Sequence, residues 1–226
     1  MSGRRYSRVV SGVAVLALFV AACGGSSSST DTSGSSDTTV AAAADNDLTA
    51  TMTVGLDSEP SSLDPAGDSL SLANGSVYDG VFEALMVGDY TKAPTPWLAK
   101  TVTESADRLS WTLVMQDGVT FHDGTPFDAA AVKFNLERQR VSPYNGSGLK
   151  NITAVDVVDP MTVKITLAVA WTAFPNVLSG INGVMVSPAS AADPEKVKRN
   201  PVGTGPFTFT EWIPSDRILL PRNDAY

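Results

Sequence analysis

The sequence predicts an α/β fold of the mixed α+β kind, in which antiparallel hairpins and helices share one chain. Residues 111–140 combine an alternating apolar pattern, two turns and an amphipathic helix, and residues 152–167 indicate a second hairpin. A length of 226 residues with 43% hydrophobic side chains is enough to bury the core that these elements require.

The chain begins with the pattern of an export signal. Arg4, Arg5 and Arg8 precede an apolar run over residues 9–20, which is shorter than a membrane-spanning helix requires. The next residues lead through Ala21-Ala22 to Cys23 and resemble a bacterial lipobox, in which the cysteine is lipidated. We therefore expect lipidated Cys23 to anchor the exported protein to the outer face of the cytoplasmic membrane. The alternative is an ordinary cleaved signal with an incidental cysteine.

A tether is expected between this signal and the folded region. Residues 24–47 consist almost entirely of Gly, Ser, Thr, Asp and Ala, which cannot bury a core. A coil of this length has an end-to-end distance of about 25–30 Å. The predicted organisation is a signal peptide over residues 1–22, Cys23 and a disordered tether over residues 23–47, and a folded region over residues 48–226.

The folded region is expected to open with a strand and a loop. Thr51–Leu56 has the composition of a strand, and Asp57–Pro65 carries prolines, serines and aspartates that favour an irregular path. Trp97 is interpreted as a core residue rather than one that stacks on a ligand.

Residues 111–140 carry the most detailed prediction. Trp111–Met115 and Val119–Phe121 alternate about Asp117-Gly118, which predicts a hairpin. A second turn follows, and Asp128 then caps a helix while Phe127 packs on a residue one turn into it. The residues expected on the buried side of the helix are Ala129, Ala130, Val132, Phe134 and Leu136, and those expected in water are Lys133, Glu137, Arg138 and Arg140.

The remaining residues predict a second hairpin and shorter elements. Gly203-Thr204-Gly205 is interpreted as a turn whose glycines adopt angles closed to other residues, because a phosphate loop would need a lysine and a following helix. The core face expected for the second hairpin is Ile152, Ala154, Val158, Val163, Ile165 and Leu167. Helices are expected over residues 171–178 and 188–198, and strands over residues 184–186, 207–212 and 217–220.

Charge and residue types argue against several classes of function. A net charge of −8 does not suit a protein that binds nucleic acid. His122 is the only histidine, and no second nitrogen or sulfur ligand remains to build a zinc site, so no metal, cofactor or catalytic residue is assigned. His122-Asp123 could act as an acid with its orienting partner, but a turn position favours a solvated histidine. The sequence does not exclude a pair of carboxylates that would cleave a glycoside, because spacing in sequence does not fix separation in space.

Three motifs carry a family resemblance. Residues 111–127 follow the pattern W-T-x-x-x-x-D-G-V-x-F-H-D-G-x-P-F, residues 63–65 are Leu-Asp-Pro, and residues 201–207 are Pro-Val-Gly-Thr-Gly-Pro-Phe. Together they resemble the extracytoplasmic solute-binding proteins of ABC importers, family 5. The resemblance implies the first lobe of a two-lobed, periplasmic-binding-protein-like type II fold, with a helix over residues 77–85. Residues 222–226 resemble the crossing into the second lobe, so the chain is expected to be truncated before that lobe, as a fragment, a truncated gene or half of a split gene.

The same resemblance implies a function and a binding segment. Family members carry oligopeptides, dipeptides and, in some cases, nickel, so we expect capture of a small peptide or related solute for an ABC permease and ATPase complex. By position, the residues that line the family's cleft are Asp68, Ser69, Leu70 and Ser71, although such residues also occur in any exposed loop. Backbone hydrogen bonds to an extended peptide would supply the binding. The alternatives are a structural or adhesive surface lipoprotein and, more weakly, an exported hydrolase.

Overall fold

The computed structural model describes residues 49–88 and 91–226. The chain divides into two units, Met1–Thr51 and Met52–Tyr226, and the helices and strands of the described residues belong to the second. The predicted signal peptide, Cys23 and the tether up to residue 47 lie outside the described residues. Within the described ranges, no helix has the length and apolar character needed to cross a bilayer.

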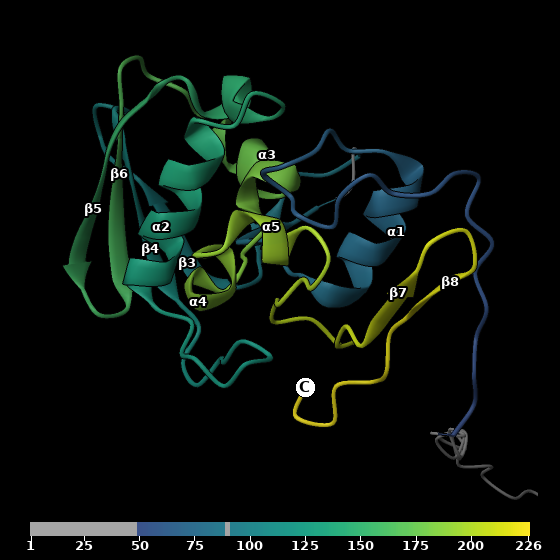
Figure 1. The fold of residues 1–226 in the computed structure, drawn as a ribbon. Coiled ribbons are helices and arrows are strands. Elements are labelled where there is room, and N and C mark those ends of the chain that lie inside the picture. Colours follow the sequence, from purple (N-terminus) through teal and green to yellow (C-terminus); the bar gives the residue numbers. More distant parts are fainter. Residues whose placement is uncertain (1–48, 89–90) are drawn as a thin grey trace, which may run out of the picture. The chain divides into compact units, whose positions relative to one another are not determined.

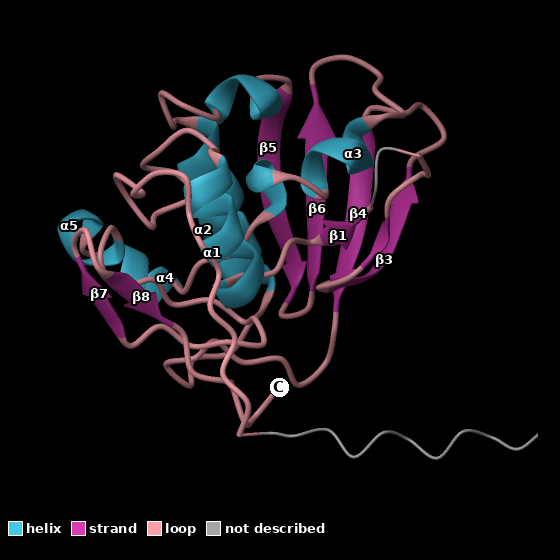
Figure 2. Cartoon of the chain, turned by 90° about the vertical axis from the view of Figure 1, so that its right-hand side faces the viewer, coloured by secondary structure: helices cyan, strands magenta, loops and turns pink. Residues whose placement is uncertain are grey.

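A four-stranded antiparallel sheet forms the framework of this unit (Figure 1, Figure 2). Along β4 the side chains alternate between buried and partly exposed, and Trp111, Leu113 and Met115 lie in the core. The sheet is therefore apolar on one face, as is usual for an antiparallel sheet with one solvated side. The strand order is β3 (Ala99–Glu104), β4 (Ser110–Met115), β6 (Thr162–Leu167) and β5 (Ile152–Asp159).

The predicted partner of Trp111–Met115 is wrong. The strand pairs with β3 on one side and with β6 on the other, so both of its edges are taken. Residues 119–121 form no strand, and a compact loop closes where Phe127 N–H donates to Val119 O at 3.0 Å. The tight turn itself is present, with Gly118 at a φ of +76°. Local alternation predicted the strand correctly but carried no information on its distant partner.

The second hairpin is confirmed, with two errors in its core face. β5 and β6 are antiparallel, and Val155 lies opposite Ile165. The buried residues of β6 and Ile152 of β5 are as predicted, whereas Ala154 is only partly buried and Val158 is 61% exposed. Irregularities in the register of β5 shift its alternation between the faces, so Val155 is buried instead of Val158.

Helix α2 (Ala129–Arg140) packs its buried residues into the same core cluster as the apolar face of the sheet. Asp128 is the N-cap, as predicted, and its Oδ1 accepts a hydrogen bond from Ala131 N–H at 2.8 Å. Ala129, Val132 and Leu136 are buried, which follows helical spacing. The predicted burial is wrong for Ala130, which is exposed, and for Phe134, which is only partly buried against a second cluster, because both lie off that stripe.

Helix α1 (Leu72–Val81) contributes the largest share of the second apolar cluster, which also includes Leu63, Val186 and Val197. The helix expected over residues 77–85 therefore begins and ends earlier in the chain. Its start is set by Ser71, whose side chain forms a capping box with Asn74.

The other elements are short, and several differ in extent from the prediction. The helix expected over residues 188–198 is split, because Pro194 begins a new turn that Asp193 caps. Residues 184–186 contain only an isolated bridge, at Val184, and α3 begins later than expected, with Pro175 in its first turn. These elements are β1 (Met86–Val87), β2 (Thr95–Pro96), η1 (Gly146–Leu149), α3 (Phe174–Leu178), η2 (Ile181–Gly183), α4 (Pro188–Ala191), α5 (Pro194–Val197), β7 (Glu211–Ile213) and β8 (Arg217–Leu219).

The strand expected over residues 51–56 does not form. Met52 and Val54 are 82% and 57% exposed, and no described segment pairs with this stretch. Residues with high strand propensity are favoured because they pack well on a pleated, half-buried sheet surface. Such a surface forms only next to a partner strand.

The turn at Gly203-Thr204-Gly205 is confirmed as structural, but for a different physical reason. A β-carbon on Gly203 would lie 2.1 Å from Val81 O, and one on Gly205 would lie 2.7 Å from Gly80 O, while neither glycine has a left-handed φ. Close approach to the end of α1, rather than unusual backbone angles, therefore requires glycine. Gly205 N–H donates to Val81 O at 3.0 Å and holds the turn there.

Asn135 joins α2 to the backbone of the second cluster. The residue is 2% exposed, its Nδ2 donates to Val186 O at 2.8 Å, and its Oδ1 accepts from Val186 N–H at 3.0 Å. Nδ2 also donates to Ala131 O at 2.9 Å. Both N–H groups and the oxygen of the side-chain amide are thus hydrogen-bonded. The two bonds to Val186 resemble those between neighbouring strands.

Candidate functional site

The segment predicted to bind ligand, Asp68–Ser71, lies at the surface just before α1. Ser69, Leu70 and Ser71 are exposed. Ser71 Oγ accepts a hydrogen bond from Asn74 N–H at 3.2 Å, so this hydroxyl has a structural task. Leu70 is 58% exposed, and its side chain is accessible to a ligand.

Side chains that follow α2 hold the backbone leading to this segment. Asn145 Nδ2 donates to Pro65 O at 2.9 Å and to Asp68 O at 3.0 Å. Ser142 Oγ donates to Ala66 O at 2.8 Å. These bonds satisfy carbonyl groups that an irregular loop would otherwise leave to water, so the loop is held in one conformation.

An ion pair fixes the base of the same loop. Arg138 Nη1 donates to Asp64 Oδ1 at 2.8 Å, and Nη2 donates to Oδ2 at 2.5 Å. The side chains are 20% and 3% exposed, so the prediction that Arg138 stays in water is wrong. Burial, followed by the charges of Asp68 and Asp64, raises the pKa of the nearby Tyr78 hydroxyl. The phenol therefore remains neutral beneath the loop.

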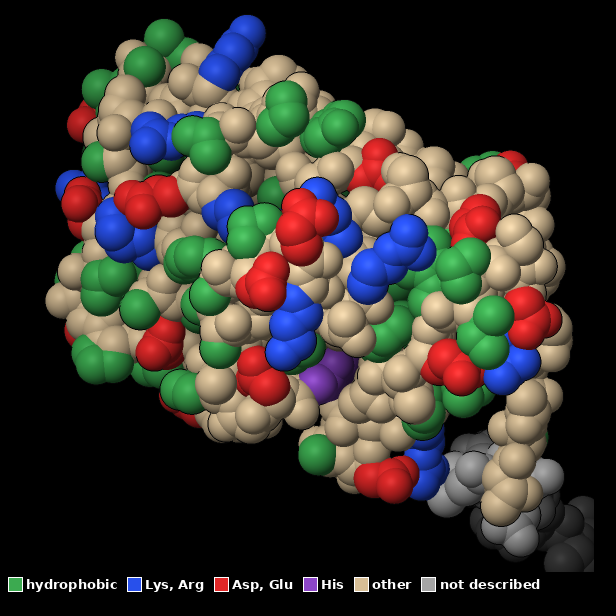
Figure 3. All heavy atoms as spheres, viewed as in Figure 1, with side chains coloured by type: hydrophobic (Ala, Val, Ile, Leu, Met, Phe, Trp, Pro, Cys, Tyr) green, Lys and Arg blue, Asp and Glu red, His purple; other side chains and the backbone are tan. Residues whose placement is uncertain are grey.

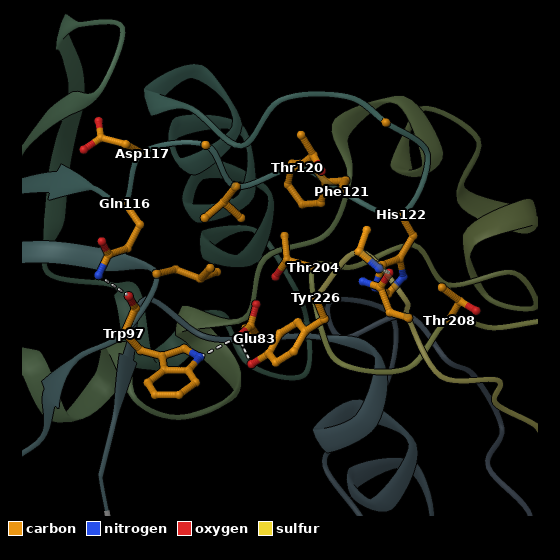
Figure 4. Close-up of a pocket in the computed structure, with 16 residues that line it drawn as sticks. Glu83, Trp97, Gln116, Asp117, Thr120, Phe121, His122, Thr204, Thr208 and Tyr226 are labelled. Atoms are coloured by element: carbon orange, nitrogen blue, oxygen red, sulfur yellow. Dashed lines mark hydrogen bonds between the residues drawn. The ribbon is translucent and has the colours of Figure 1, made fainter. Parts of the chain in front are cut away.

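A cleft of about 560 Å³ lies at the other end of α1 (Figure 4). It begins at Glu83, the residue after the C-cap Phe82, and residues 68–71 do not line it. Its lining residues are Glu83, Trp97, Leu98, Gln116, Asp117, Gly118, Val119, Thr120, Phe121, His122, Gly124, Thr204, Thr208, Asn223, Ala225 and Tyr226.

Glu83 is the hydrogen-bonding centre of this cleft. Its Oε1 accepts one bond from Trp97 Nε1–H at 2.7 Å and another from the Tyr226 hydroxyl at 2.9 Å, and Figure 4 shows the three side chains converging. Burial and the bond to Glu83 raise the pKa of Tyr226, so its hydroxyl keeps the proton that it donates. Trp97 is 46% exposed and is not the core residue that the sequence predicted.

His122 lines the cleft, but it does not pair with Asp123. His122 Nε2 lies 2.9 Å from Gly205 O, whereas Asp123 accepts hydrogen bonds from Ser187 and Thr125. Burial favours a raised pKa for Asp123, but the bonds from Ser187 and Thr125 outweigh it and lower the pKa. The expectation of a solvated histidine is wrong, since His122 is partly buried and bound to the glycine turn.

Charged side chains of both signs are interspersed on the face shown in Figure 3. Within residues 49–88 and 91–226, no three side chains of His, Cys, Asp or Glu are grouped so that they could hold a metal ion.

Sequence reasoning missed Glu83, Tyr226 and Asn145. Glu83 and Tyr226 are 143 positions apart, so no local pattern joins them. Asn145 lies in a turn-rich loop, and its composition alone gave no sign that its amide binds a distant backbone. Only the fold brings each of these residues to its partner.

Comparison with known proteins identifies the family of this chain. Residues 93–226, more than half of the chain, match the family model of bacterial extracellular solute-binding proteins, family 5. The glutathione-binding protein of Salmonella paratyphi A is 38% identical over 184 residues, which are 77% of this chain and 35% of that protein. The corresponding protein of Pectobacterium atrosepticum is 38% identical over 173 residues, which are 73% of this chain and 33% of that protein.

Solved structures show the same relationship. A Campylobacter jejuni protein in complex with Ni(L-His) is 28% identical with a TM-score of 0.64, over 74% of this chain and 34% of that one. A Helicobacter pylori periplasmic binding protein in complex with the peptide STSA is 26% identical with a TM-score of 0.64, over 74% of this chain and 38% of that one. The mixed α/β fold expected for a type II periplasmic binding protein is confirmed, and the chain spans about a third of the length of these relatives. The chain therefore belongs to the bacterial extracellular solute-binding proteins of family 5.

Proposed function

We propose that the protein captures a small peptide outside the cytoplasmic membrane and delivers it to an ABC permease and its ATPase. The observation that carries the proposal is the 38% identity to glutathione-binding proteins. Glutathione is a tripeptide, and the Helicobacter pylori relative holds the peptide STSA. We therefore propose a short peptide, an oligopeptide or a dipeptide, as the solute of this chain.

We place the peptide against Asp68, Ser69, Leu70 and Ser71. This segment is accessible, Leu70 offers an apolar side chain, and Asn145 holds the backbone on one side of it. An extended peptide can exchange backbone hydrogen bonds with such a segment. Because the segment is ordered before binding, less conformational entropy is lost when the peptide arrives.

We further propose that lipidated Cys23 keeps the protein at the outer face of the membrane, close to the permease. The basic and apolar residues before Cys23 and the polar tether after it support this placement. Family membership gives no support to the adhesive lipoprotein or to the exported hydrolase, since the relatives are named as binding proteins.

Calorimetry tests the peptide proposal. Residues 68–71 present an open surface, where each hydrogen bond nets about 0.5–1.5 kcal/mol and each ordered peptide residue costs about 1–2 kcal/mol. We therefore expect the purified chain to bind a mixed di- to hexapeptide library no more tightly than the millimolar range. A chimera in which this chain replaces the matching region of the Salmonella glutathione-binding protein should bind peptides in the micromolar range.

A matched pair of variants locates the surface. Leu70→Asp in the chimera should weaken peptide binding about tenfold or more, because it places a desolvated charge against the ligand. Val158→Asp, at a position that is 61% exposed on β5, should leave the affinity unchanged. Micromolar binding by the chain alone would contradict the open-surface argument. A folded chimera that binds no peptide would contradict the proposed function.

A further inference from the structure

The cleft beside Glu83 presents a hydrogen-bond acceptor that lacks a donor. Both hydrogen bonds to Glu83, from Trp97 and Tyr226, end on Oε1. The second oxygen, Oε2, accepts no hydrogen bond from the described part of the chain. An ionised carboxylate only accepts, so this oxygen favours an occupant that brings N–H or O–H groups.

His122 and Thr204 each carry a polar atom without a partner beside the same cleft. A carbonyl oxygen only accepts, so the Nε2 atom that lies 2.9 Å from Gly205 O carries a proton and donates it within the fold. Nδ1 is buried and has no partner within the described residues, and the same holds for Oγ1 of Thr204, a residue that is 4% exposed. A buried polar atom without a partner costs about 1–3 kcal/mol, so this side of the cleft favours a polar occupant over an apolar one.

Trp97 adds an aromatic surface next to the carboxylate. Its indole N–H is held by Glu83 at 2.7 Å, which orients the ring, while the residue remains 46% exposed. The face of an indole attracts a cation that lies within about 6 Å of the ring centroid. A carboxylate and an indole face side by side therefore recognise an ammonium group rather than an anion.

The size of the cleft fits a small organic molecule. Its volume of about 560 Å³ falls within the range of about 300–1,000 Å³ that is usual for small-molecule sites. The other acidic side chain of the lining, Asp117, is paired with Lys100 at 2.8 Å. Glu83 is thus the lining carboxylate whose charge is left for a ligand.

We propose that this cleft is a second binding site, which takes a small organic cation with a primary ammonium group attached to an apolar or aromatic body. Glu83 Oε2 accepts a hydrogen bond from the ammonium group, and the body lies on Trp97. The site is separated from Asp68–Ser71 by the length of α1 and goes beyond the proposed function, because it does not depend on peptide transport.

Titration of the purified chain with benzylamine, followed by NMR of the backbone amides of residues 203–205 and the Trp97 indole N–H, tests this site. We expect saturable shifts with a dissociation constant in the millimolar range, and none with benzyl alcohol, its neutral counterpart. Glu83→Gln keeps an Oε1 acceptor for Trp97 and Tyr226 but removes the charge, so it should weaken binding about tenfold or more. Glu195→Gln, at an exposed position on α5, is the matched control and should not change the affinity.

Each outcome decides the proposal. Equal binding of benzyl alcohol would show an apolar contact only and would overturn it, as would a dissociation constant that Glu83→Gln leaves unchanged or the absence of saturable shifts. If Glu83→Gln fails to fold, Trp97→Ala replaces it, followed at the amides of residues 203–205. Loss of the aromatic face should then weaken benzylamine binding several-fold, and an unchanged affinity would overturn the proposal.

Discussion

Replacing Arg138 by Met should lower the free energy of unfolding by about 3–5 kcal/mol, because it leaves a buried carboxylate without its countercharge. The Asp64 side chain is 3% exposed and receives both bonds of the guanidinium group, at 2.8 and 2.5 Å. Two hydrogen bonds to a charged group, at about 1.5–3 kcal/mol each, give a similar loss. The loop that leads to Asp68 should also lose its fixed base.

Urea unfolding monitored by tryptophan fluorescence measures the loss. Lys100→Met is the control, since Lys100 and Asp117 form an ion pair whose side chains are 53% and 74% exposed, and such a pair is worth about 0–1 kcal/mol. Asp64→Asn in the Arg138→Met background should recover part of the stability by removing the unpaired charge. A cost for Arg138→Met no larger than that for Lys100→Met would refute the argument.

Replacement of Cys23 by Ser should move the exported protein to the soluble fraction, because the lipid chains that supply about 0.8 kcal/mol per buried CH₂ are lost; a variant retained at the membrane would show another anchor. Leu136→Ala should cost about 2–5 kcal/mol in urea unfolding, and Phe134→Ala should cost less because its side chain is only partly buried; the reverse order would mean that α2 faces the other way. The stability advantage of the wild type over Asp123→Asn should hold above about pH 4 and disappear as the pH falls through the lowered pKa of Asp123, below its ordinary value of 3.8; an advantage that grows on acidification would contradict this.

Local patterns predicted the elements whose causes are local. The cap at Asp128, the turn at Gly118 and the hairpin of β5 and β6 depend on a few neighbouring residues, and all three are confirmed. The strand over residues 51–56 and the partner of Trp111–Met115 depend on distant pairing, and both predictions are wrong. The predicted burial of Val158 is wrong for a related reason, because an irregularity in the register moves a side chain to the other face of the sheet.

The candidate site likewise combines residues that the sequence placed with residues that only the fold brings together. Residues 68–71 were placed by resemblance, and the structure adds what sequence did not contain, namely the hydrogen bonds from Asn145 and Ser142 that hold the preceding backbone. The cleft escaped prediction because Glu83, Trp97 and Tyr226 meet only after the chain has folded. Trp97 was assigned to the core because large aromatic residues are usually buried, and here the bond to Glu83 holds the ring at the surface instead.

The amide of Asn135 has a consequence for how residues 52–226 come apart. The helix that carries it packs on the sheet, whereas Val186, its backbone partner, belongs to the other apolar cluster. If one cluster opens alone, the groups that remain in the other, either the Asn135 amide or the two backbone groups of Val186, lose their partners while buried, and each such group costs about 1–3 kcal/mol. Local melting of one cluster is thereby penalised. Both clusters should lose their amide-exchange protection in a single cooperative event, and Asn135→Leu should split that event into two.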